Sequence, residues 1–225
     1  MPLLARKLGL AAMLLTAASA YGADGACVEP PRGQEREATA LKRSGGRAIR
    51  LGDLLHLTTA AGPVELQDNS ASCDGVGQVD ECRRFGLVDW IAEHGWLVVH
   101  AGYWEAESYI VVVASTGEQV VLEGYPWLSL DRSRLVTVTG NESGELFNGV
   151  DIWRIDGAVP RLEQRLENEP RSSGIEFFCF AGWRDDAQVD LRGARYVDRP
   201  PTSSVQVPST LNRTRQEWRL QVGPR

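Results

Sequence analysis

The run Tyr-Ile-Val-Val-Val-Ala at residues 109–114 is the strongest indicator of fold in this chain of 225 residues. Val and Ile are β-branched and favour extended backbone, so the run predicts a β-strand. Ser-Thr-Gly-Glu at 115–118 then predicts a tight turn into a second short strand at 119–122.

Similar runs recur on both sides of this hairpin, separated by turn signals such as Ala-Gly-Pro at 61–63. No stretch shows a long apolar period near 3.6 residues. The fold class expected is therefore all-β, an antiparallel sandwich, barrel or propeller built from many short strands. The further strands expected lie at 54–59, 64–67, 85–92, 96–104, 135–139, 150–155, 175–181, 187–191, 194–197 and 218–222.

The order Thr116-Gly117, then Pro126-x-x-Ser129-x-Asp131, then Ile152-Trp153 resembles one blade of a propeller-like β-repeat of the S-P-D-G type. Leu130 and Arg132 stand where that repeat has Pro and Gly. Residues 95–157 also resemble uncharacterised exported bacterial proteins that carry this repeat. The resemblance implies a blade near 109–157 and transfers no catalytic residue.

A propeller blade takes about 40 residues, so the chain has room for about five at most. We expect a partial, non-closed propeller-like or sandwich-like stack rather than a closed ring, which needs about four complete blades. The expected organisation is a signal peptide at 1–20, an extended polar arm at 21–47 and a β-rich domain at 48–225. Within the arm, residues 36–43 could form one or two helical turns or a disordered linker.

The first 20 residues have the three parts of a cleavable secretory signal: Arg6 and Lys7, an apolar stretch at 8–18, and Ala18-Ser19-Ala20. A buried helix or an uncleaved anchor is the alternative. Asp24 disfavours lipid modification at Cys27, so a soluble periplasmic or extracellular product is expected, with no membrane span.

The charge balance excludes one class of partner. Cleavage would remove Arg6 and Lys7, so the net charge of −6 would become −8. Sequence-independent binding to nucleic acid needs clustered positive charge, and so does docking on anionic lipid. No nucleic-acid partner is expected.

The four cysteines, Cys27, Cys73, Cys82 and Cys179, suggest two disulfides in an exported chain, and three pairings are open. Cys73 and Cys82 flank a polar, Gly-containing loop, which favours their pairing and leaves Cys27 to tie the arm to a core strand through Cys179. A zinc site is the alternative, but there is no C-x-x-C and no histidine at ligand spacing.

Catalytic signals are weak. His56, His94 and His100 each lie in or beside an expected strand, and no G-x-S-x-G elbow is present. We expect no cofactor, no metal and no catalytic residue, although a site assembled from scattered Asp, Glu and His stays open.

The aromatic residues give the best candidate site. Most of the seven tryptophans are expected in the core. Adjacent residues of a strand point to opposite faces, so Tyr103 or Trp104 should face outward. The candidate binding surface comprises Tyr103, Trp104, Glu105, Glu107, Tyr125 and Trp127.

These features favour a non-enzymatic exported binding or interaction module whose partner is an envelope protein, a peptide or a glycan. Two alternatives are an envelope hydrolase and an inhibitor or immunity-type partner of an envelope enzyme.

Overall fold

The computed structural model describes residues 26–74, 78–140, 147–197, 203–215 and 217–223. The apolar run at 109–114 lies in β6 (Glu107–Val113). From residue 109 to 113, odd-numbered side chains face one hydrophobic core and even-numbered ones face another. Because β6 is buried on both faces, its apolar run is continuous rather than alternating.

Fifteen strands of the described chain form four antiparallel sheets, and in every sheet neighbouring strands follow one another in sequence. The first sheet contains β1 (Ala48–Leu51), β2 (Leu54–Thr59) and β3 (Gly62–Gln67). The second contains β4 (Arg84–Ile91), β5 (Trp96–Gly102), β6 and β7 (Gln119–Leu122). The third contains β8 (Trp127–Leu128), β9 (Arg134–Thr139), β10 (Gly149–Arg154) and β11 (Arg161–Glu167). The fourth contains β12 (Phe177–Asp185), β13 (Gln188–Val197), β14 (Ser203–Thr214) and β15 (Glu217–Val222).

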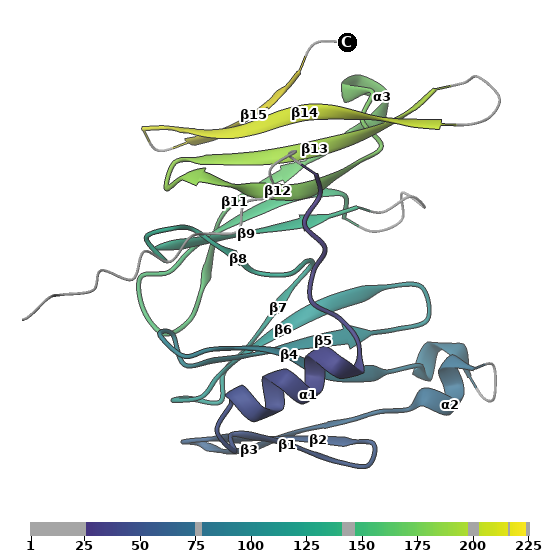
Figure 1. Ribbon diagram of the computed structural model, residues 1–225, viewed down its shortest axis with the longest axis vertical. Helices are drawn as coiled ribbons and strands as arrows, with labels where there is room; N and C mark the ends of the chain where they lie inside the picture. Colours follow the sequence, from purple (N-terminus) through teal and green to yellow (C-terminus); the bar gives the residue numbers. More distant parts are fainter. Residues whose placement is uncertain (1–25, 75–77, 141–146, 198–202, 216, 224–225) are drawn as a thin grey trace, which may run out of the picture.

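The sheets stack in chain order, as the colours from blue to yellow show in Figure 1. Three hydrophobic cores fill the spaces between them. The first lies between the first and second sheets, the next between the second and third, and the last between the third and fourth. The expected all-β stack is confirmed.

Two boundaries differ from those expected. The segment 109–157 does not form one sheet, because β7 pairs with β6 in the second sheet while β8 begins the third. The runs expected at 187–191 and 194–197 are one strand, β13, because Arg192 and Gly193 continue its pairing with β12. Strands β1, β8, β11 and β14 were not among those expected; β11 (RLEQRLE) carries four charged residues and has little apolar signal.

Of the two alternatives open for residues 36–43 within the expected arm, the helical one is confirmed, and the helix is longer than expected: α1 spans Gln34–Arg43. Ala40 is buried and Leu41 packs against the core between the first two sheets, so burial of one face stabilises the helix. Residues 26–32 ahead of the helix are extended, and we call them the arm; Figure 1 shows the arm running past the second and third sheets to β12.

Arg50 holds the first sheet, α1 and the second sheet together. Its guanidinium pairs with Glu37 of α1 at 2.6 Å and with Asp68 at 3.3 Å, and it donates to the carbonyl of Phe85. The Asp68 carboxylate also accepts the backbone N–H of Phe85 at 2.7 Å. Burial raises the pKa of Asp68 above its usual range, although the Phe85 hydrogen bond and Arg50 oppose this.

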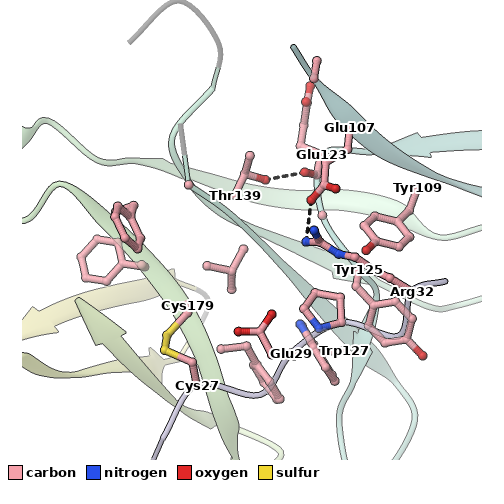
Figure 2. Close-up of a pocket in the computed structure, with 18 of the residues that line it drawn as sticks. Cys27, Glu29, Arg32, Glu107, Tyr109, Glu123, Tyr125, Trp127, Thr139 and Cys179 are labelled. Atoms are coloured by element: carbon pink, nitrogen blue, oxygen red, sulfur yellow. Dashed lines mark hydrogen bonds and ion pairs between the residues drawn. A yellow bond between two sulfur atoms is a disulfide. The ribbon is translucent and has the colours of Figure 1, made fainter. Parts of the chain in front are cut away.

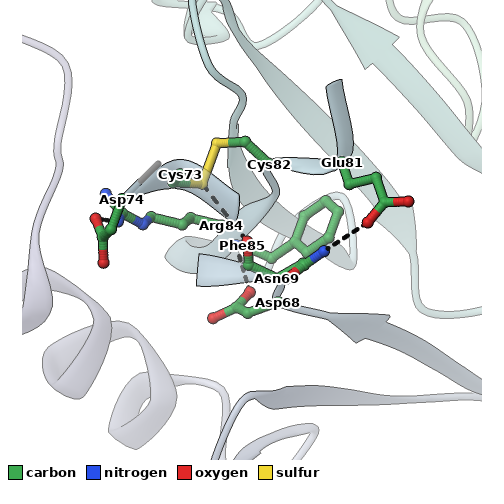
Figure 3. Close-up of a disulfide and its surroundings, with 8 residues drawn as sticks. All are labelled: Asp68, Asn69, Cys73, Asp74, Glu81, Cys82, Arg84 and Phe85. Carbon is green, nitrogen blue, oxygen red and sulfur yellow. Dashed lines mark hydrogen bonds and ion pairs between the residues drawn. A yellow bond between two sulfur atoms is a disulfide. The ribbon is translucent and has the colours of Figure 1, made fainter. Parts of the chain in front are cut away.

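Both expected disulfides are confirmed. Cys73–Cys82 links α2 (Ser70–Cys73) to the end of the short helix η1 (Val79–Glu81), as Figure 3 shows. Cys27–Cys179 ties the arm to β12. Structural disulfides of this kind indicate a compartment outside the reducing cytoplasm.

The remaining described helix is the single turn α3 (Pro170–Ser173). Among the described helices, none is long and apolar enough to cross a membrane. The expected signal peptide at 1–20 lies outside the described residues.

Candidate functional site

An open cleft of about 540 Å³ lies where the second, third and fourth sheets meet the arm. Its lining comes from the β5–β6 turn, the β7–β8 connection, the end of β9 and the start of β12, together with residues 27–32 of the arm. Figure 2 shows these elements around the cleft. The volume is in the range of small-ligand sites.

All six residues of the surface expected from the sequence line this one cleft: Tyr103, Trp104, Glu105, Glu107, Tyr125 and Trp127. They come from two segments, one ending at the first residue of β6 and the other following β7. The cleft forms because the pairing of β5, β6 and β7 returns the chain to the same end of the sheet.

Tyr103 and Trp104 lie in the turn after β5 rather than in a strand, since β5 ends at Gly102. The turn is closed by a hydrogen bond from the Tyr103 N–H to the Ala106 carbonyl at 2.8 Å. Both rings are exposed, Tyr103 by 41% and Trp104 by 49%. The sequence predicted that only one of these two rings would face outward, but both do. Side chains alternate between two faces only in a strand, and these two residues lie in a turn.

Tyr125 and Trp127 are built into the molecule more deeply than a surface platform would require. Tyr125 is buried and packs edge-on against Tyr109 and Trp127, and its hydroxyl donates to the Asp89 carboxylate at 2.9 Å. Trp127 stacks on Phe180 of β12, with ring centroids 4.5 Å apart. These aromatic rings form the floor of the cleft and join the two cores on either side of the third sheet.

The arm forms a wall of the cleft and is fixed at both ends. Near its start, Cys27 is bonded to Cys179 and the Val28 N–H donates to the carbonyl of Phe180 at 2.8 Å. At its end, Arg32 pairs with Glu107 at 2.7 Å. Figure 2 shows Glu29 and Arg32 reaching from the arm into the cleft.

Of the carboxylates that the structure describes in the cleft, Glu107 has both an ion pair and a hydrogen bond to neighbouring side chains. One oxygen pairs with Arg32, and the other lies 3.1 Å from Nε2 of His100. The His100 hydrogen bond, aided by the charge of Arg32, holds the pKa of Glu107 below its usual range although burial opposes this. Glu107 is therefore ionised at neutral pH.

Tyr109 contributes a buried hydroxyl to the cleft. The residue is 1% exposed, and its hydroxyl makes no well-formed hydrogen bond within the described part of the chain, although the Arg32 guanidinium lies near it. Burial raises the pKa of Tyr109 to about 12, so the hydroxyl is neutral and can both donate and accept. A buried polar group without a partner costs about 1–3 kcal/mol, which a ligand could recover.

A second, smaller pocket of about 330 Å³ lies on the other side of the β5–β6 turn. It is lined by the Cys73–Cys82 disulfide, Arg84 and His100, and it shares Trp104 and Glu107 with the cleft. In Figure 3, Arg84 lies beside Asp74, and their side chains pair at 2.5 Å. The exposed turn at 103–106 therefore places the Tyr103 and Trp104 rings between the cleft and this smaller pocket.

The three histidines do not gather at the cleft. His56 lies on β2 beside Glu65, His94 stacks on Trp96 in the turn after β4, and His100 on β5 contacts the cleft through Glu107. Within the ranges that the structure describes, no three His, Cys, Asp or Glu side chains come together as a metal site.

Sequence reasoning missed the contributions of the arm (Glu29 and Arg32), of Glu123 after β7, of Thr139 at the end of β9, and of Phe177, Phe178 and Phe180 on β12. The aromatic run at 177–180 was visible as a strand, but its place in the site depends on how the third and fourth sheets stack. The expected Cys27–Cys179 pairing was the one signal that brought the arm to β12.

Comparison of the chain with known protein families, curated proteins and solved structures finds no match. The candidate site therefore depends on the geometry of this chain alone.

Proposed function

We propose that this chain is an exported binding module, acting in the periplasm or outside the cell, that holds a partner in the cleft between its second, third and fourth sheets. The sheets then serve as blades of an open propeller-like stack. The observation that carries this proposal is the convergence of exposed aromatic rings and carboxylates in one cleft, with the exposed Tyr103 and Trp104 at its rim.

Two further features support an exported binding role. The paired disulfides suit an oxidising compartment, where such bonds persist. Cys27–Cys179 also fixes the arm as a wall of the cleft, so the site is largely preformed. Preorganisation reduces the entropic cost of binding.

A hydrolase is the second candidate, favoured by the carboxylates that line the cleft, among them Glu105 and Glu123. Glycoside hydrolysis needs one carboxyl group to donate a proton. Glu107 does not suit that role, because its lowered pKa keeps it ionised. Release of reducing ends from oligosaccharides by the wild-type protein, abolished in Glu105→Gln or Glu123→Gln, would favour the hydrolase.

Capture of partners from an envelope extract of the source cells tests the binding proposal. The wild-type protein is compared with Tyr103→Ala/Trp104→Ala, which removes the exposed rings at the rim. The matched control is Leu162→Ala/Val205→Ala, which removes two exposed apolar side chains from β11 and β14.

We expect the rim variant to lose partners that the control variant retains. The same set of captured proteins for all three versions would contradict the proposal. An envelope enzyme among the lost partners, inhibited by the wild-type protein, would identify the inhibitor or immunity-type version of this function.

A further inference from the structure

The lining of the cleft is strongly anionic. Four glutamates border it, Glu29, Glu105, Glu107 and Glu123, and Arg32 is the single Lys or Arg among the described lining residues. Arg32 is already neutralised by Glu107. A concave surface of one charge sign raises the local concentration of ligands of the opposite sign.

Three of these carboxylates make no close pair with a cation in the described part of the chain, although Glu123 interacts with Arg165 at longer range. Within the described ranges, the side chains of Glu29, Glu105 and Glu123 form no hydrogen bond and no ion pair. Covering them with a neutral ligand would remove water without supplying counter-charge, which is unfavourable. A cationic ligand would supply that counter-charge.

The aromatic rings of the cleft fit the same ligand. Trp, Tyr and Phe faces attract Lys and Arg head groups, with Trp the strongest. Trp104 and Tyr103 present exposed rings beside Glu105, so an aromatic face and a carboxylate are adjacent at the rim. This pairing suits the stem and the head group of an Arg or Lys side chain.

The buried hydroxyl of Tyr109 points to a ligand with an amide backbone. Figure 2 shows the Tyr109 ring directed toward the cleft near Arg32. The hydroxyl lies near the Arg32 guanidinium but makes no well-formed hydrogen bond within the described chain, so a group from outside could still bond it. A peptide backbone provides both a carbonyl acceptor and an N–H donor, either of which can bond this hydroxyl.

We propose that the cleft binds an extended peptide segment bearing Arg or Lys side chains. The aromatic floor and rim contact the side-chain stems, while Glu29, Glu105 and Glu123 pair with the cationic groups. The Tyr109 hydroxyl hydrogen-bonds the peptide backbone. This inference rests on the proposed function and specifies its ligand.

Fluorescence anisotropy of a labelled hexapeptide of alternating Gly and Arg tests the inference on the mature wild-type protein. The matched peptide replaces each Arg by citrulline, which has a similar shape and no charge. We expect the Arg peptide to bind at least about tenfold more tightly at low salt, and the difference to shrink as salt is raised.

The protein variants locate the binding. Glu29→Gln/Glu123→Gln should weaken binding of the Arg peptide by about tenfold or more, because each change removes a charge with little change in shape. The control Glu65→Gln/Glu118→Gln removes the same charge from β3 and from the β6–β7 turn, outside the cleft lining. Tyr109→Phe should weaken binding without altering the salt dependence.

Equal affinity for the Arg and citrulline peptides, or equal loss in the two double variants, would overturn the inference. Binding of chitohexaose instead, sensitive to Trp104→Ala, would overturn it while leaving the proposed binding function intact. If no probe binds, the inference fails, and the capture experiment with the rim variant decides the proposed function separately.

Discussion

Trp127 of β8 stacks face to face on Phe180 of β12, with ring centroids 4.5 Å apart and planes inclined by 8°. The contact joins the third sheet to the fourth at the floor of the cleft. Trp127 also packs against both cores that flank the third sheet. The residue therefore supports the fold as well as lining the site.

Trp127→Ala should lower the free energy of unfolding by about 3 kcal/mol, because it removes a large ring from between two cores. Trp104→Ala should change it by less than about 0.5 kcal/mol, because that ring is half exposed in a turn. Urea denaturation followed by circular dichroism measures both. Equal effects of the two substitutions would contradict the structural role of Trp127.

Arg50→Ala should destabilise the protein by about 3 kcal/mol, because it leaves the largely buried carboxylates of Glu37 and Asp68 without their counter-charge. Arg184→Ala is the control, since its pair with Asp190 is exposed and should contribute less than about 0.5 kcal/mol. Chemical denaturation near neutral pH compares the two. Similar losses would show that the Arg50 network does not hold α1 between the sheets.

The two disulfides should contribute unequally to stability. The Cys27–Cys179 bond spans 152 positions and the Cys73–Cys82 bond spans 9. On the chain-entropy model, removing the first as Cys27→Ser/Cys179→Ser should cost about 5 kcal/mol, and removing the second about 3 kcal/mol. Denaturation of the two double variants measures the order, and the reverse order would contradict a folded state in which the arm is anchored at β12.

Glu107 should make stability dependent on pH in the acidic range. Its folded pKa lies below the ordinary value of 4.5, chiefly because of the His100 hydrogen bond, so its contribution is present above about pH 4.5 and is lost as pH falls through the lower folded pKa. Thermal midpoints of the wild type and Glu107→Gln should differ most near neutral pH and converge as the pH falls below the folded pKa of Glu107. A constant difference across this range, as expected for a purely steric effect, would contradict the assignment.

Much of the fold could be predicted because each sheet is a chain of hairpins. The runs at 54–59 and 119–122 coincide with β2 and β7, and Gly-containing turns separate them from their neighbours. The strand β11 could not be predicted, since its side chains are largely solvated and charged. Helix α1 was expected only as one or two turns at 36–43, with a disordered linker as the alternative, because its stability comes from packing on β4 rather than from a long apolar pattern.

The site could be predicted only on one side. Tyr103, Trp104 and Trp127 were visible as aromatics in or beside expected strands, and they do line the cleft. The opposite wall depends on stacking of β12 against the third sheet and on the arm that Cys27 anchors. Such contacts between distant segments leave no pattern in local sequence.

Hydrogen–deuterium exchange of the protein with and without the Gly-Arg hexapeptide is the most direct test of the central claim, that the cleft is a binding site for cationic peptide. The account predicts slower exchange in segments 26–32, 103–109, 123–127 and 177–180, which line the cleft, and no change in β1 to β3. Unchanged exchange throughout the cleft segments at saturating peptide, or protection confined to the first sheet, would contradict it.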